Sequence, residues 1–226
     1  MEITWLGHSA FLIKGKNKIL IDPFLTGNPM ASTTHDKISC DVICVTHGHE
    51  DHVGDTVAIA KKNKAKVLAI VELAEHFEKA GCETIGFNIG GSVNIGETKV
   101  AMTHAIHSSG ADAPGLEGAA GAPVGFAIES EKIVYHSGDT ALFSDMALIG
   151  SLYHPDVAML PIGGYFTMDV MQAVIAVELI KPKIVIPMHY NTWPPIKTDP
   201  QKFKSEVDNI SKTQVKILKP GESFTL

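Results

Sequence analysis

Residues 41–52 read Asp-Val-Ile-Cys-Val-Thr-His-Gly-His-Glu-Asp-His. The first six residues are typical of a buried strand, and this strand delivers the chain directly into the histidines. His47, His49, Asp51 and His52 therefore share one strand-to-helix turn. Imidazole and carboxylate are the ligands that borderline divalent metals prefer, zinc above all. Because a place in the core would require four polar side chains to be buried together, the pattern predicts a metal site.

Four side chains on one short turn cannot enclose a pair of metal ions, so the remaining ligands must come from other parts of the chain. The candidates are His107, Asp139 and His189, each of which follows a predicted strand. Strand ends are where loops gather into sites on sheet scaffolds. His104 competes with His107 for the same role, but we expect it on or beside a strand and favour His107.

Short strands and helices alternate along the chain. The expected strands are 3–6, 10–13, 18–21, 41–46, 66–70, 83–87, 92–95, 98–103, 124–129, 132–136, 157–160, 184–187 and 214–218, and the expected helices are 53–62, 72–80, 168–180 and 200–210. This mixture predicts an α/β (α+β) fold, a four-layer αβ/βα sandwich with two mixed β-sheets face to face and helices outside. No linker divides the chain, so we expect residues 1–226 to form one domain.

Residues 108–123 stand apart because glycine and alanine dominate the segment. This composition has high backbone freedom and cannot build a core element. We expect a long loop, and such loops in compact domains are usually functional or disordered.

Composition excludes several classes of protein. The net charge is −6 and no block of Lys or Arg is present, so a nucleic-acid partner is not expected. Residues 1–15 lack the basic and apolar regions of a signal peptide, and no apolar run is long enough for a membrane helix. We therefore expect a cytoplasmic protein without a membrane partner. The three cysteines are expected to be small buried hydrophobes.

Several motifs occur together in an order that resembles the metallo-β-lactamase superfamily. They are Ile21-Asp22-Pro23, the segment 46–52, His107-Ser108, Ser137-Gly138-Asp139-Thr140 and Met188-His189. The sequences that flank these motifs are Trp5-Leu6-Gly7-His8-Ser9, Pro161-Ile162-Gly163-Gly164 and the segment 187–192. They are similar to a small branch of the superfamily known only as metal-dependent hydrolases, which is related to the bacterial ascorbate-6-phosphate lactonases.

The resemblance implies two divalent metal ions, with zinc favoured and Mn, Fe or Ni also tolerated. The ligands divide into His47, His49 and His107 for the first ion, Asp51, His52 and His189 for the second, and Asp139 as a bridge. Such a pair makes a bridging hydroxide available at neutral pH. We therefore expect a hydrolase of an ester, lactone or phosphodiester bond in a small anionic substrate, with Asp51 as a further candidate for steering the water.

Other positions are given roles around this centre. In the resembling branch His8 lies close to the metals, which suggests a catalytic or supporting role. Asp22 resembles the aspartate that orients the histidine loop by hydrogen bonds. Gly163 and Gly164 permit close approach to a substrate, and Thr167 is expected to cap a helix whose N-terminus favours an anionic group.

Three other functions compete with this one. A tRNA 3′-processing nuclease shares the metal motif but is longer and carries a tRNA-gripping insertion. A non-catalytic metal-binding or ligand-binding module remains open, although a complete ligand set argues against it. A di-iron reductase is disfavoured because His49 stands where that relative usually has Glu. Neither the substrate nor the oligomeric state follows from the sequence, and a homo-oligomer is compatible with it.

Overall fold

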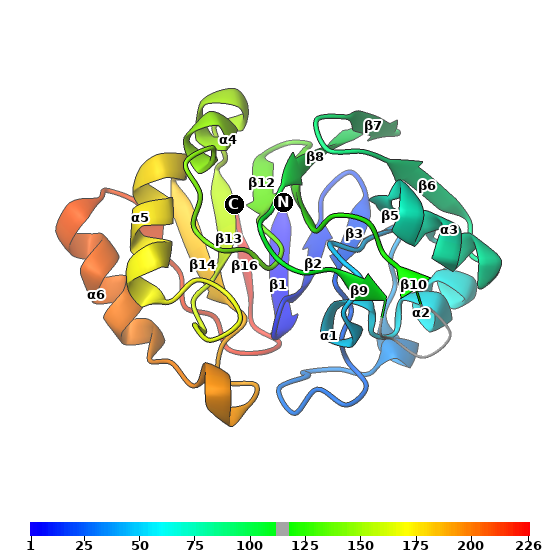
Figure 1. Cartoon of the computed structure of the whole chain (residues 1–226), viewed down its shortest axis with the longest axis horizontal. Coiled ribbons are helices and arrows are strands. Elements are labelled where there is room, and N and C mark those ends of the chain that lie inside the picture. The colour runs from blue at the N-terminus through cyan, green and yellow to red at the C-terminus, as the bar shows by residue number, and fades with distance from the viewer. Residues whose placement is uncertain (112–117) are drawn as a thin grey trace.

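The structure is a computed structural model that describes residues 1–111 and 118–226. Its N-terminal sheet has seven strands, antiparallel at one side and parallel at the other (Figure 1). Their order is β16 (Ser223–Thr225), β1 (Glu2–Gly7), β2 (Ala10–Lys14), β3 (Lys18–Ile21), β4 (Val42–Cys44), β5 (Lys66–Ile70) and β6 (Thr84–Phe87). The pairs from β16 to β3 are antiparallel, and those from β3 to β6 are parallel.

A second sheet of seven strands repeats this division. Their order is β15 (Gln214–Val215), β14 (Ile184–Met188), β13 (Val157–Pro161), β12 (Ile133–His136), β11 (Val124–Glu129), β8 (Thr98–His104) and β7 (Ser92–Ile95). The pairs from β15 to β12 are parallel, and those from β12 to β7 are antiparallel. All five residues of β13 are buried, as expected of a strand covered on both faces. In the edge strand β7, exposed and half-buried residues alternate.

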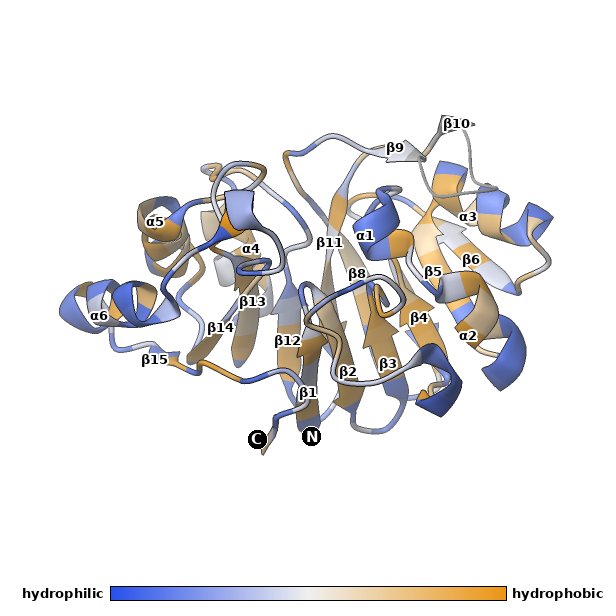
Figure 2. Cartoon of the chain, turned by 90° about the horizontal axis from the view of Figure 1, so that it is seen from below, coloured by the Kyte–Doolittle hydropathy of each residue, from blue (hydrophilic) through white to orange (hydrophobic). Residues whose placement is uncertain are grey.

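Helices cover the outer faces of the two sheets (Figure 2). On one side lie α1 (Glu50–Val53), α2 (Thr56–Asn63) and α3 (Val71–Lys79), and on the other α4 (Met146–Tyr153), α5 (Val170–Ile180) and α6 (Pro200–Ile210). The two short 3-10 helices are His35–Lys37 and Pro194–Ile196. The predicted four-layer sandwich is thus confirmed. Within the described residues, no helix is long and apolar enough to cross a membrane.

Large side chains fill the space between the sheets. Trp5, Phe11 and Phe126 are almost completely buried in one hydrophobic core. The Trp5 ring stacks on Phe11 at 6.5 Å and on Tyr190 at 5.5 Å between centroids. The Trp5 indole N–H also donates to the carbonyl oxygen of His8 at 2.9 Å, so the core directly supports the turn that carries this histidine.

The glycine-rich segment contains two very short strands, β9 (Gly110–Ala111) and β10 (Gly118–Ala119), which pair with each other. The expected loop at 108–123 thus includes a small hairpin, and its residues 112–117 lie outside the described part of the chain. The segment packs on the histidine turn, because a Cβ at Gly48 would clash with Ala120 and with the carbonyl oxygen of Gly110.

Two helix predictions are wrong in detail. The helix expected at 53–62 is divided into α1 and α2 at Gly54, whose φ is +41° and which packs against the backbone of Pro23. The helix expected from residue 168 begins two residues later, because Asp169 rather than Thr167 is its N-cap. The Asp169 carboxylate accepts a hydrogen bond from the backbone N–H of Gln172, and the Gln172 side-chain oxygen accepts one from the backbone N–H of Asp169. Helix α4 and strand β16 were not predicted.

Candidate metal centre

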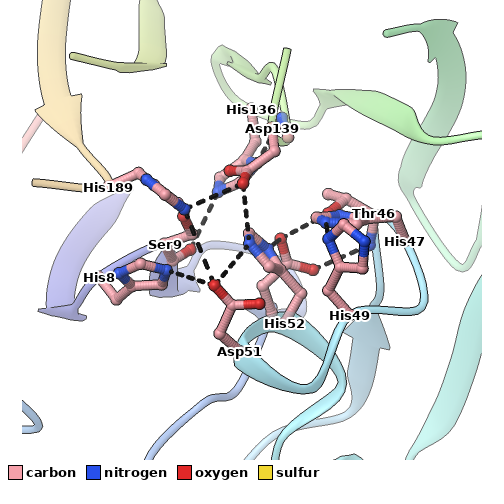
Figure 3. Close-up of polar contacts among 12 residues, drawn as sticks. His8, Ser9, Thr46, His47, His49, Asp51, His52, His136, Asp139 and His189 are labelled. Carbon is pink, nitrogen blue, oxygen red and sulfur yellow. Dashed lines mark hydrogen bonds and ion pairs between the residues drawn. The ribbon is translucent and has the colours of Figure 1, made fainter. Parts of the chain in front are cut away.

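Seven predicted ligands meet where strands of both sheets terminate, and all of them except His107 are labelled in Figure 3. Strand β4 leads into His47 and His49, and α1 presents Asp51 and His52. The other three come from loops after β8, β12 and β14, namely His107, Asp139 and His189. The sheets thus bring together residues that are distant in sequence, as the positions past strand ends predicted.

The cluster contains three overlapping groups whose nitrogen and oxygen atoms lie within 4.8 Å of one another. They are His47, His49 and His107; His47, His52 and Asp139; and His8, Asp51, His52 and His189. Asp139 stands between the two expected ligand sets. Its Oδ2 lies 2.9 Å from Nε2 of His189, 3.3 Å from Nε2 of His52 and 3.6 Å from Nε2 of His107.

A buried carboxylate sets the orientation of His52. Asp22 accepts hydrogen bonds from the backbone N–H of Thr46 at 2.8 Å, from the Thr46 hydroxyl at 2.7 Å and from Nδ1 of His52 at 2.8 Å. The orienting role expected for Asp22 therefore has a structural basis. Nδ1 of His52 therefore carries a proton and Nε2 faces the cluster. Burial would lower the pKa of this ring, but the carboxylates of Asp139, Asp51 and Asp22 outweigh it and raise the pKa well above its usual value, so a proton occupies Nε2 unless a cation takes its lone pair.

This lone pair faces another electron-rich atom. Nε2 of His52 is buried and has no hydrogen-bond partner among the described residues, although the Asp139 carboxylate is 3.3 Å away. The second oxygen of Asp139 is also buried without a partner. A lone pair and a carboxylate at this distance repel each other unless a proton or a cation lies between them. The donor set therefore fits a divalent cation held by imidazole and carboxylate.

The same reasoning applies to His47 and His49. The Thr46 hydroxyl donates to Asp22, so it accepts the proton of Nδ1 of His47 at 3.0 Å and leaves Nε2 with a lone pair. That Nε2 lies 2.9 Å from Nδ1 of His49, whose other nitrogen is 3.3 Å from the Ser108 hydroxyl. One proton lies between these two nitrogens, and a second cation in its place would be held by both lone pairs.

Opposing charges and burial shift the acidity of the cluster in several directions. Burial alone would raise the pKa of Asp139, but the imidazoles of His189 and His52 hold it well below its usual range. Burial lowers the pKa of His189, yet the Asp139 carboxylate outweighs it and raises this pKa to about 9. Burial also lowers the pKa of His47 and His107. The carboxylates thus stabilise positive charge at the centre while two of the imidazoles stay neutral.

His8 is completely buried beside the cluster. Its Nε2 is 3.1 Å from Oδ2 of Asp51, and its Nδ1 is 2.7 Å from the Thr192 hydroxyl. Burial lowers the pKa of His8 to about 4, so the ring is neutral near pH 7. It follows that Nε2–H donates to Asp51 and the Thr192 hydroxyl donates to Nδ1. Sequence reasoning placed His8 near the metals but missed Thr192, which gave no signal apart from its place shortly after His189.

Backbone conformation is unusual at three of these positions. His8, Asp22 and His189 have φ values of +55°, +44° and +54°, in the left-handed region that favours glycine. Such residues concentrate at functional sites, where the surrounding structure holds them in place. Here the backbone N–H of His189 donates to the carbonyl oxygen of His8 at 3.1 Å, which ties the two turns together.

His104 does not join the cluster. It is the last residue of β8, it is exposed, and its ring contacts Phe143 with 5.4 Å between centroids. The structure therefore supports the preference for His107, which the loop after β8 carries back towards His47 at 5.2 Å between ring centroids. His136 is also separate, because its Nε2 donates to the carbonyl oxygen of Ser9.

A cavity of about 840 Å³ opens onto the cluster. Five residues of the cluster line it, namely His49, Asp51, His107, Asp139 and His189. Gly163, Gly164 and Thr167, which we expected beside the substrate, are not among its lining residues. Gly163 has a different role, since a Cβ there would overlap the carbonyl oxygen of His189. The absence of a side chain at Gly163 thus lets the His189 turn pack closely.

Residues 2–189 match the family described as the beta-lactamase superfamily domain. The chain belongs to the metallo-β-lactamase superfamily. The superfamily resemblance seen in the sequence is thereby confirmed. Similar members include two proteins named UPF0173 metal-dependent hydrolase. The one from Archaeoglobus fulgidus is 50% identical over 99% of this chain and 98% of its own length. The one from Methanosarcina barkeri is 48% identical over 100% of this chain and 99% of its own length. The solved structure of Igni18, a metallo hydrolase from Ignicoccus hospitalis, superposes with a TM-score of 0.91 at 41% identity and covers 100% of this chain and 98% of its own.

Proposed function

We propose that this metallo-β-lactamase superfamily protein is a metal-dependent hydrolase with two divalent cations, which cleaves an ester, lactone or phosphodiester bond of a small-molecule substrate. The observation that supports this most strongly is the cluster of seven imidazole and carboxylate side chains, in which Nε2 of His52 and one oxygen of Asp139 are buried without a hydrogen-bond partner among the described residues. Relatives named metal-dependent hydrolases support the reaction type.

The proposed ligands form two sets around Asp139. They are His47, His49 and His107 for one ion, Asp51, His52 and His189 for the other, and Asp139 between them. The ligand chemistry favours zinc. The chemistry that such a pair supplies when bound is a hydroxide at neutral pH and polarisation of the scissile carbonyl or phosphoryl oxygen.

Residues of the chain provide the positioning. Asp22 and Thr46 accept the Nδ1 protons of His52 and His47, so that Nε2 of each ring is the nitrogen left to bind a cation in the cluster. His8 donates to Asp51 and holds this carboxylate towards the cavity.

Asp51 itself stays ionised at neutral pH. Burial would raise its pKa, but the neighbouring His52 and the hydrogen bonds from His189 and His8 lower it far below the usual value. A carboxylate this acidic is a weak base. We therefore assign Asp51 the task of orienting the attacking water, and His8 that of positioning Asp51.

We also propose that the protein works in the cytoplasm. Its three cysteines are buried and unpaired, as is usual in a reducing compartment.

Two measurements test the proposal. They are metal content by elemental mass spectrometry and hydrolysis of a panel of esters, lactones and phosphodiesters. We expect about two metal ions per wild-type chain. His107→Ala and Asp139→Ala are expected to lose metal and activity. His104→Ala is the matched control, because this histidine lies at the same strand end but outside the cluster, and it should keep both. Wild-type protein that takes up no metal after reconstitution, or that hydrolyses no member of the panel when loaded, would refute the proposal.

A further inference from the structure

Three aromatic side chains from three separate loops line the cavity above the cluster. Phe24 follows β3, Phe166 lies between β13 and α5, and Trp193 follows β14. Phe24 and Trp193 contact each other with 5.9 Å between ring centroids. Both rings also pack against His8, at 5.8 Å and 5.0 Å. This pair, which we call the aromatic wall, is therefore fixed to the same histidine that positions Asp51.

Phe166 adds a third aromatic ring to the cavity lining, from the loop between β13 and α5. Its side chain is 53% exposed although it is a large apolar group, and it lines the cavity. Its neighbour Tyr165 is 80% exposed and does not line the cavity. Exposed aromatic side chains that border a concave site are typical of ligand contacts.

The charged residues of the cavity are all acidic or imidazole. Among the described residues that line it there is no Lys or Arg, whereas Glu50, Asp51 and Asp139 are present. Lys197 lines a different hollow, which shares only Trp193 with this one. Residues 112–117 have the sequence Asp-Ala-Pro-Gly-Leu-Glu, which also lacks Lys and Arg.

The helix N-terminus that we expected to attract an anion is already satisfied. The Asp169 carboxylate caps α5 and accepts from the backbone N–H of Gln172. This places a negative charge at the helix end, where it opposes a second anion. An anionic group on the part of the substrate away from the metals would thus lose its hydration among aromatic rings without a countercharge.

We propose that the substrate is an uncharged ester or lactone whose planar apolar group lies against the aromatic wall and Phe166. This inference rests on the proposed hydrolase function and narrows it, because a substrate with an anionic group away from the scissile bond becomes unfavourable, contrary to the expectation from the sequence. The specificity then comes from apolar contact and from the absence of a Lys or Arg side chain among the described residues that line the cavity.

Two esters that differ only in charge test the substrate class. Metal-loaded protein is given 4-carbamoylphenyl acetate, which is uncharged, and 4-carboxyphenyl acetate, which carries a carboxylate at the far end of the same planar group. We expect kcat/KM to be higher for the uncharged ester by about tenfold or more. Equal values, or a preference for the carboxylate, would overturn the inference.

Variants of Phe166 separate contact from charge. Phe166→Ala should raise KM for the uncharged ester by about tenfold and change kcat by less than about twofold, because it removes binding and not chemistry. Leu152→Ala, at a large apolar side chain that is 73% exposed on α4 and does not line the cavity, is the control and should leave both constants unchanged. Phe166→Arg should shift the ratio of the two kcat/KM values by about tenfold towards the anionic ester. An unchanged KM in the first variant, or an unchanged ratio in the last, contradicts the assigned contact.

A binding measurement distinguishes failure of this inference from failure of the hydrolase proposal. The probes are 4-carbamoylbenzohydroxamic acid and 4-carboxybenzohydroxamic acid, which share a metal-chelating end and differ in the charge of the distal group. Calorimetry on metal-loaded protein should show tighter binding of the carbamoyl probe by about tenfold. If this preference is found but neither ester is hydrolysed, the cavity inference stands and the proposed ester hydrolysis fails. Equal affinities, tighter binding of the carboxy probe or no binding of either overturns the inference.

Discussion

Replacing Asp22 by Asn should reverse the proton positions in the cluster while leaving the fold almost intact. Asn, like Asp, tolerates the φ of +44° at this position, and its oxygen can still accept from the backbone N–H of Thr46. The new amide, however, would donate where the carboxylate accepted. The Thr46 hydroxyl would then donate to Nδ1 of His47, and Nδ1 of His52 would accept from the amide. Both histidines would carry their proton on Nε2, the nitrogen that faces the other side chains of the cluster.

The expected magnitudes follow from this exchange. Because each hydrogen bond is replaced by another, the free energy of unfolding of the metal-free protein should fall by no more than about 1 kcal/mol. Metal binding must remove the two misplaced protons, so affinity should fall by about 10–100-fold, or about 1.4–2.7 kcal/mol. Competition with a chelating dye measures the affinity, urea unfolding measures the stability, and nitrogen-15 NMR of the imidazoles reports the proton positions.

Asp55→Asn is the matched control. The Asp55 carboxylate also accepts three hydrogen bonds, from the backbone of Leu25 and from the backbone and hydroxyl of Thr26, but it contacts no imidazole in the cluster. This substitution should reduce stability and leave metal affinity unchanged. The reasoning is refuted if Asp22→Asn binds metal within about twofold of wild type, or if the NMR spectra show Nδ1 still protonated in both rings.

Two further predictions concern positions around the site. Gly163→Ala should force the His189 turn apart, lowering stability by about 1–3 kcal/mol and reducing metal affinity. Gly164→Ala, where the nearest contact of a Cβ is 3.6 Å and φ is +64°, should lower stability by about 1–2 kcal/mol through backbone strain alone. Urea unfolding measures the stability and chelator competition the metal affinity, and equal metal affinities in the two variants would contradict the prediction. All three cysteines are buried, and burial raises the pKa of Cys40 to about 12. Ellman's reagent at pH 8 should therefore label the thiols only after unfolding. Rapid labelling of the folded protein would contradict this prediction.

The ligand set could be predicted because its chemistry and its position are both local signals. His47 to His52 lie on one turn, and the other ligands follow recognisable buried strands. In a sandwich of two sheets such strand ends converge, so side chains that are far apart in sequence become neighbours. The nitrogens left to bind a cation and the part played by Thr46 could not be predicted, since they depend on which atoms Asp22 reaches in the folded chain.

Elements without a local signal were missed. Helix α4 reads Met-Ala-Leu-Ile-Gly-Ser-Leu-Tyr, with no charged residue and no side-chain cap, so its amphipathic period is weak. The aromatic wall was not predicted because Phe24 and Trp193 are separated by most of the chain and contact each other and His8 only in the folded protein. Substrate contacts depend on loop geometry, which residue type alone does not determine.

The short strand β16 protects the rest of the molecule from unwanted association. It pairs with β1 over three registered positions, from Glu2 opposite Thr225 to Thr4 opposite Ser223. Without it, the exposed edge of β1 would present unpaired backbone N–H and C=O groups, which can recruit a strand from another copy into a growing aggregate. Since β1 runs directly into the turn that carries His8, a deletion of only the last few residues would endanger both colloidal stability and the positioning of Asp51.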